Sequence, residues 1–305
     1  MAEPPVPNAA PRALDPASVQ AILRRLARQP QPPWLHGEVA RRMAERLPVI
    51  RKQPRTVIEW SGFLGASGGV LDAAYPQAAR IVVEADAGLR ERSALERKSP
   101  WWSARRWRGG PAVLVPAEVQ PASGELLWAN MVLQGEPDPT AAMAHWHRAL
   151  AAEGFLMLST LGPGSLPELR TLYRAHGWGP PMAEFVDMHD LGDMLVHAGF
   201  ADPVMDQEMV TLTWASAQAA LDELRLLGGN AHPVRQRGLR TPRWHGRLLQ
   251  ALQSRADPQG RIALQFEIVY GHAFRPVPKP RVQAQTSVSL DSMREMVRSG
   301  RPREP

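Results

Sequence analysis

The sequence predicts an α/β fold: a doubly wound, mostly parallel sheet of seven strands, with helices on both faces and an antiparallel edge strand. Residues 125–200 carry the strongest signal, because buried strands and amphipathic helices alternate there at βαβα spacing. Shorter apolar strands precede this run, and two long strand candidates, at 203–214 and 261–274, follow it. We expect this last pair to form the antiparallel edge that many parallel sheets carry.

The individual elements follow from local patterns. Ser18 is expected to cap a helix over 19–29, and a second helix is expected over 35–47. Pro139 suits the first turn of a helix that Gly154 is expected to close. Further strands are predicted at 56–60, 80–86, 112–118, 126–134 and 155–161, and further helices at 166–177, 188–198, 216–229 and 244–254.

Composition bounds the class of protein. One domain is expected over residues 17–275, and the proline-rich ends, 1–16 and 276–305, are expected to be poorly ordered. The chain has no cysteine, which excludes disulfides, thiolate metal sites and a cysteine nucleophile, and fits a reducing cytoplasm. No apolar run approaches the ~18 residues of a membrane span, and no secretory signal pattern opens the chain. We therefore expect a cytoplasmic protein without a membrane partner.

The net charge of +6 comes largely from arginine, concentrated at 105–108 and 235–247. Such a basic surface attracts nucleic acid, anionic membranes or acidic proteins. The alternative is a solvated arginine-rich face with no partner.

A glycine-rich turn follows the first strand, at residues 61–69. Its four glycines allow positive φ and a close approach of backbone to a ligand, but their spacing is neither GxGxxG nor that of a phosphate loop. The turn therefore indicates either a nucleoside-like cofactor or a purely structural bend. Asp86 ends the second strand, 21 residues after Gly65, where a carboxylate can accept hydrogen bonds from ribose hydroxyls. Glu84 competes for that role, and either acid can instead be a surface residue.

Two other kinds of chemistry are excluded. The histidines and acids show no metal-ligand spacing; His145 and His147, for example, are two apart on one helix and do not share a face. No GxSxG motif is present, which argues against a serine hydrolase.

Five segments carry a family resemblance. They are LHGEVARRMAERL at 35–47, ANMVLQ at 129–134 followed by Asp-Pro and an amphipathic helix, GFLMLSTLGPGSLPELR at 154–170, FVDMHDLGDMLVHAGFADPVMD at 185–206, and FEIVYGHAF at 266–274. With these segments, residues 17–275 resemble the malonyl-acyl-carrier-protein O-methyltransferase family of biotin synthesis, within the class I S-adenosylmethionine-dependent methyltransferases.

The resemblance implies a cofactor, S-adenosylmethionine, bound at the ends of the first, second and fourth strands. Its implied contacts are Glu59 in the first strand, Gly62 and Gly65 beside the methionine part, Asp86 at the ribose, Glu118 after the third strand, and Asn130 near the reacting methyl group.

The first loop departs from the family pattern of an acid followed by GxGxG. The aligned glycine positions hold Ser61, Phe63 and Gly65, and Phe63 would enter the cofactor space unless the loop takes another path through Gly68 and Gly69. Two hypotheses follow: an active methyltransferase, or a cofactor-deficient protein of the same fold that acts as a binding or regulatory partner. A nucleic-acid methyltransferase is a third, disfavoured because the fourth strand ends in ANMV and not in an Asn-Pro-Pro-aromatic motif.

Methylation of a carboxylate needs no catalytic base, because the nucleophile is already ionised, so no catalytic residue is predicted. It does need a cation for the substrate carboxylate, and Arg170 is the candidate. His189 and Asp187 are expected at the acyl entrance, unless Asp187 only caps the next helix. We expect an acidic acyl carrier protein, bearing the malonyl thioester, to dock on the arginines of 235–247, and no nucleic-acid partner.

Overall fold

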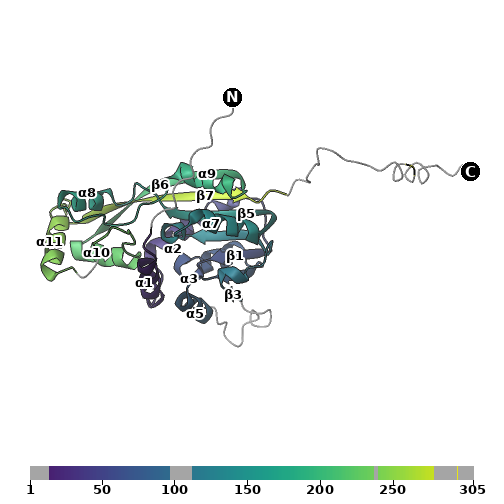
Figure 1. Cartoon of the computed structure of the whole chain (residues 1–305), viewed down its shortest axis with the longest axis horizontal. Helices are drawn as coiled ribbons and strands as arrows, with labels where there is room; N and C mark the ends of the chain where they lie inside the picture. Colours follow the sequence, from purple (N-terminus) through teal and green to yellow (C-terminus); the bar gives the residue numbers. More distant parts are fainter. Residues whose placement is uncertain (1–13, 97–111, 237–239, 278–293, 295–305) are drawn as a thin grey trace, which may run out of the picture.

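The computed structural model describes residues 14–96, 112–236, 240–277 and 294. Its sheet has seven strands in the order β3-β2-β1-β4-β5-β7-β6 (Figure 1). The strands are β1 (Thr56–Trp60), β2 (Ala79–Val83), β3 (Ala112–Leu114), β4 (Gly124–Asn130), β5 (Leu150–Leu161), β6 (Ala201–Trp214) and β7 (Ile262–Phe274). The first five run parallel, and β7 is antiparallel to both of its neighbours, β5 and β6. The predicted mixed sheet is confirmed.

Helices cover both faces of this sheet. Those used below are α1 (Pro16–Ala27), α2 (Trp34–Ala44), α3 (Gly62–Gly65), α4 (Gly68–Ala74), α5 (Ala87–Glu96), α7 (Pro139–Ala149), α8 (Pro167–Ala175), α9 (Met188–His197), α10 (Ala217–Leu226) and α11 (Pro242–Gln253). Alternate strand residues point to opposite faces. On one face Leu126 and Trp128 pack with α2, α8 and α11; on the other, Leu127 and Ala129 pack with α7 and α9.

The strands β6 and β7 are the longest, and they extend past the parallel strands to where α8, α10 and α11 gather (Figure 1). The apolar core follows them, because Leu248 and Leu252 of α11 belong to the same cluster as Phe266 of β7. This arrangement sets a helical layer beside the carboxyl ends of the parallel strands.

Three local predictions are wrong. Asp15, and not Ser18, caps α1: its carboxylate accepts the Ala17 N–H, and the Ser18 hydroxyl donates to Asp15. Gly154 does not close α7, because the helix ends at Ala149 and the backbone is already extended at Leu150, where β5 begins. Residues 61–69 are not a plain loop but contain α3 and the start of α4.

The described fold begins before residue 17. Leu14 is buried, and the Asp15 N–H donates to the Ala231 carbonyl at 2.8 Å. The remaining predicted tail residues, 1–13, 278–293 and 295–305, and the basic run 105–108 lie outside the described residues. None of the described helices is long and apolar enough to cross a membrane.

Candidate functional site

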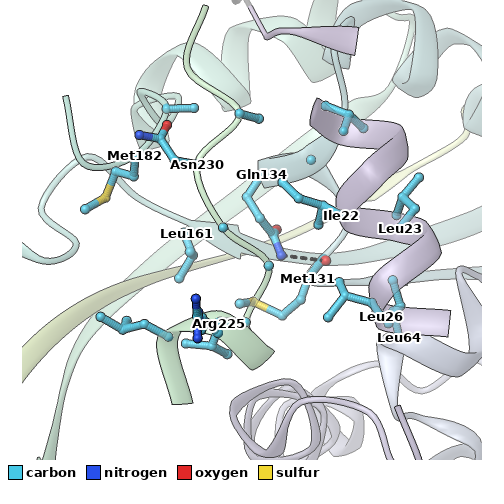
Figure 2. A pocket seen from close by; sticks show the side chains of 18 of the residues that line it. Ile22, Leu23, Leu26, Leu64, Met131, Gln134, Leu161, Met182, Arg225 and Asn230 are labelled. Atoms are coloured by element: carbon cyan, nitrogen blue, oxygen red, sulfur yellow. Dashed lines mark hydrogen bonds between the residues drawn. The ribbon is translucent and has the colours of Figure 1, made fainter. Parts of the chain in front are cut away.

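A cavity of about 420 Å³ opens at the carboxyl ends of β1 and β2 and continues beneath α1, α8, α10 and α11. Its position is where doubly wound sheets bind ligands, and its volume lies in the range of small-molecule sites. Figure 2 shows apolar side chains of α1, including Ile22, Leu23 and Leu26, along one side of it. On the other side lie Leu161 and Met182, with Arg225 of α10 at the edge.

The loop after β1 takes a helical path that leaves the cavity open. Ser61 has φ of 61°, and α3 then places the buried Phe63 ring in a cluster with Leu26 and Leu89. Phe63 is not part of the cavity lining. The substitution expected to fill the cofactor space therefore does not do so in this structure.

Two acids follow β2, and both line the cavity. Glu84 is buried and accepts hydrogen bonds from the Phe63 N–H at 2.9 Å and from the Ser93 hydroxyl at 2.6 Å. Asp86 accepts the Gly88 and Leu89 N–H groups, at 2.9 and 3.2 Å, at the start of α5. Glu84 thus holds the first loop in place, while Asp86 begins a helix.

Asn130 ends β4 and is fully buried. Its amide nitrogen donates to the carbonyls of His36 and Gly65, at 2.8 and 2.7 Å, and its amide oxygen accepts from the Ser159 hydroxyl at 2.7 Å. The side chain therefore joins α2, α3 and β5, and the next residue, Met131, lines the cavity in its place.

Four further predicted cofactor contacts are not part of the cavity lining: Glu59, Gly62, Gly65 and Glu118. The buried Glu59 carboxylate lies 3.7 Å from the Arg80 guanidinium, which also donates to the Gly68 carbonyl and to Asp72. The Arg80 side chain thereby links α4 to β1. Glu118 is exposed and accepts the Val115 N–H within the turn after β3.

The predicted substrate residues also lie outside the cavity lining. Arg170 donates from Nε to the Ser165 carbonyl at 3.3 Å, and its Nη2 is buried without a hydrogen-bond partner in the described part of the chain. His189 is exposed on the first turn of α9, which Asp187 caps. The cationic side chain that lines the cavity is Arg225, which no sequence motif marks.

A buried histidine lines the cavity from α2. His36 is 3% exposed, and its Nδ1 donates to the Leu64 carbonyl at 2.7 Å. Burial lowers the pKa of His36 to about 4, so the ring is neutral near neutral pH. A single histidine in an apolar helix pattern gives no sequence signal for such a role.

Three cavity residues have a backbone conformation that L-residues rarely adopt: Ser61, Met131 and Leu166, with φ of 61°, 54° and 54°. Such strain costs roughly 1–3 kcal/mol per residue and is concentrated at functional sites. The presence of three such residues in this lining supports a binding role for the cavity.

The chain is similar over most of its length to malonyl-acyl-carrier-protein O-methyltransferases. It is 39% identical to the one from Laribacter hongkongensis, over 81% of this chain and 84% of that protein. It is 36% identical to the one from Gallionella capsiferriformans (80% and 85%) and 34% identical to the one from Halorhodospira halophila (86% and 91%). No family model matches the chain.

Solved structures agree on the fold. A Bacillus halodurans protein described as a methyltransferase matches with a TM-score of 0.50 and 12% identity, over 77% of this chain and 99% of its own. The cyclase SpnF matches with a TM-score of 0.50 and 15% identity, over 88% and 100%. At this identity the likeness concerns architecture alone, and the cyclase illustrates that one fold serves several chemistries.

Proposed function

Because the chain belongs to the malonyl-acyl-carrier-protein O-methyltransferase family, we propose that it transfers the methyl group of S-adenosylmethionine to the free carboxylate of a malonyl thioester on an acyl carrier protein, a step of biotin synthesis. The observation that carries the proposal is the open cavity at the ends of β1 and β2, with Glu84 and Asp86 in its wall. The cofactor-deficient alternative came from the departures in the loop after β1, and the ring of Phe63, the bulkiest of them, lies outside that cavity.

The residues present fit the proposed cofactor. Glu84 and Asp86 offer carboxylate oxygens to ribose hydroxyls, and such charge-assisted bonds are strong. Gly62 and Gly65 are buried in α3 and lie outside the cavity lining, so they stay candidate contacts of the methionine part. Asn130 is assigned a positioning role, because its amide groups hold α2 and α3 at the strand end.

The bound cofactor supplies an electrophilic methyl group on a cationic sulfur. The chain itself contributes orientation and the exclusion of water, since a malonyl carboxylate is ionised at neutral pH and no base has to remove a proton. The apolar side chains from α1, α8 and α11 exclude water, because they surround the cavity in which the reacting groups would lie. We keep Arg170 and His189 as candidate substrate contacts, to be tested by Arg170→Gln and His189→Gln.

Calorimetric titration with S-adenosylhomocysteine tests the cofactor site. We expect Glu84→Gln to weaken binding about 10-fold or more, because it removes charge from an acceptor in a buried site, and Asp86→Asn to weaken it less. Asp190→Asn, on the exposed first turn of α9, is the matched control and should bind as wild type does.

Mass spectrometry of malonyl-acyl-carrier protein incubated with S-adenosylmethionine tests the reaction, with the methyl ester as the expected product. If the wild-type chain shows neither heat nor a thermal shift with S-adenosylhomocysteine, the cofactor-deficient hypothesis replaces this one.

A further inference from the structure

Two arginines meet at the outer edge of the cavity, one from α1 and one from α10. Arg25 donates from Nη2 to the Arg225 carbonyl at 3.1 Å, so the two side chains belong to one surface. Together with Gln29 and Asp222 they line a hollow beside the cavity, and Arg225 lines the cavity itself. Figure 2 labels Arg225 among the side chains that line the cavity.

The chain after α10 leaves room for this pair. Gly228 and Gly229 have φ of 136° and 138°, and both line the cavity. A Cβ on Gly229 would lie 3.4 Å from the Arg25 guanidinium. The glycines therefore let the α1 arginine lie over the turn.

The pair is not neutralised from within the described chain. No described carboxylate lies within 4.0 Å of either guanidinium, and the nearby Asp222 accepts from Gln218. Partial burial and the charge of Arg225 lower the pKa of Arg25, as expected for two adjacent cations. Two like charges held together, with Asp222 nearby but not paired to either of them, favour an anion beside them.

The cavity lining combines three kinds of side chain. Glu84 and Asp86 are acidic, Leu166 and Phe266 are apolar, and Arg225 is cationic. Arg25 lies with Arg225 in the hollow beside the cavity. An elongated substrate with a neutral stem and an anionic end suits a lining in which apolar side chains adjoin a pair of arginines.

We propose that Arg25 and Arg225 form a subsite for the phosphate of the phosphopantetheine arm that carries the malonyl thioester. This inference rests on the proposed function, because acyl carrier proteins present their acyl groups on such an arm. Guanidinium groups bind phosphate oxygens through paired, charge-assisted hydrogen bonds. The neutral pantetheine stem lies in the apolar part of the cavity, and the phosphate marks its outer end.

The test compares two small substrates that differ only in the phosphate: malonyl-4′-phosphopantetheine and malonyl-pantetheine. For Arg25→Gln combined with Arg225→Gln, we expect kcat/KM for the phosphorylated substrate to fall about 10-fold or more, through KM. The value for malonyl-pantetheine should stay at the wild-type level. Replacing both residues by lysine should restore part of the loss, because the charge is kept.

The matched control is Arg24→Gln, on the same helix, where the exposed Arg24 side chain hydrogen-bonds to Gln20. Thermal melting checks that every variant folds. An equal loss on both substrates, or no loss on the phosphorylated one, overturns the proposal. So does a loss confined to the intact carrier protein, which would place the arginines against the carrier and not the phosphate.

A second readout separates this inference from the proposed function. Calorimetry with 4′-phosphopantetheine alone measures the subsite without turnover, and we expect the double Gln variant to bind it more weakly than the Arg24→Gln control. If the wild type methylates neither substrate yet still shows this difference, the reaction assignment fails and the phosphate subsite stands.

Discussion

His36 couples the cavity wall to pH. Its pKa is lowered from about 6.5 to about 4, because the ring is buried between α2 and the loop after β1. Between these two pH values the unfolded chain binds a proton that the folded chain does not, so the free energy of unfolding decreases as pH falls from about 6.5 toward 4. As pH rises across this range, His36 raises the free energy of unfolding by ~3 kcal/mol, and the increase is complete above the upper of the two pH values.

His36→Gln should therefore make the protein less sensitive to acid. Between about pH 7 and pH 5 we expect the variant to lose ~2 kcal/mol less unfolding free energy than wild type, as measured by urea denaturation. His189→Gln, at an exposed position, should follow the wild-type curve. If His36→Gln shows the wild-type slope, another group controls the acid response.

Ser61 has a conformation that suits glycine. At φ of 61° the backbone is strained by the presence of a Cβ atom. The glycine that the family pattern has at this position would not be strained. We expect Ser61→Gly to raise the free energy of unfolding by about 0.5–1 kcal/mol, after the entropy cost of glycine is subtracted. Ser254→Gly, at φ of −66°, relieves no strain and should be neutral or destabilising in the same denaturation assay. A destabilised Ser61→Gly would mean that the hydroxyl contributes more than the strain costs.

At the scale of elements, the Asn130 side chain joins α2, α3 and β5. Asn130→Ala removes hydrogen bonds to the carbonyls of α2 and α3 and to Ser159 of β5, all in the buried core. We expect a loss of roughly 3 kcal/mol, because buried groups are left without partners. A double-mutant cycle with Ser159→Ala should show a coupling of about 1 kcal/mol. Additive effects would contradict the shared network.

The sequence could predict those elements whose own residues determine them. The bounds of β1, Thr56–Trp60, and the place of Pro139 in the first turn of α7 were predicted from local pattern and are confirmed. The helical path of residues 61–69 was not predicted, because α3 depends on groups distant in the sequence. Glu84 accepts a hydrogen bond from the Phe63 N–H, and the Asn130 amide donates one to the Gly65 carbonyl. Local glycine content alone indicates a loop.

The site was less predictable than the fold for the same reason. Asp86 and its competitor Glu84 both reach the cavity, because strand ends converge at one edge of a parallel sheet. Arg225 and Arg25 are 200 residues apart, and neither lies in a motif. Only the packing of α1 against the turn after α10 brings them together.

At the scale of the whole molecule, the arginine-rich segment 235–247 divides into structural and exposed members. Arg235 pairs with Asp15 at 2.6 Å, and Arg240 donates to the Trp178 carbonyl and lies over the Trp244 ring. Arg243 and Arg247 are exposed, one turn apart on α11. Among the described arginines of this segment, these two remain to attract an acidic carrier protein, while Arg237 lies outside the described residues.

We expect the charge reversal Arg243→Glu with Arg247→Glu to lower kcat/KM for malonyl-acyl-carrier protein about 10-fold at low salt, because it replaces attraction by repulsion during encounter. The difference from wild type should shrink as salt is added, and kcat/KM for malonyl-pantetheine should not change. Arg51→Glu with Arg90→Glu, both at exposed positions outside α11, changes the net charge by the same amount and is the control. If the reversal leaves turnover of the carrier-borne substrate at the wild-type level at low salt, α11 is not the docking face. The steering charge must then lie elsewhere on the surface.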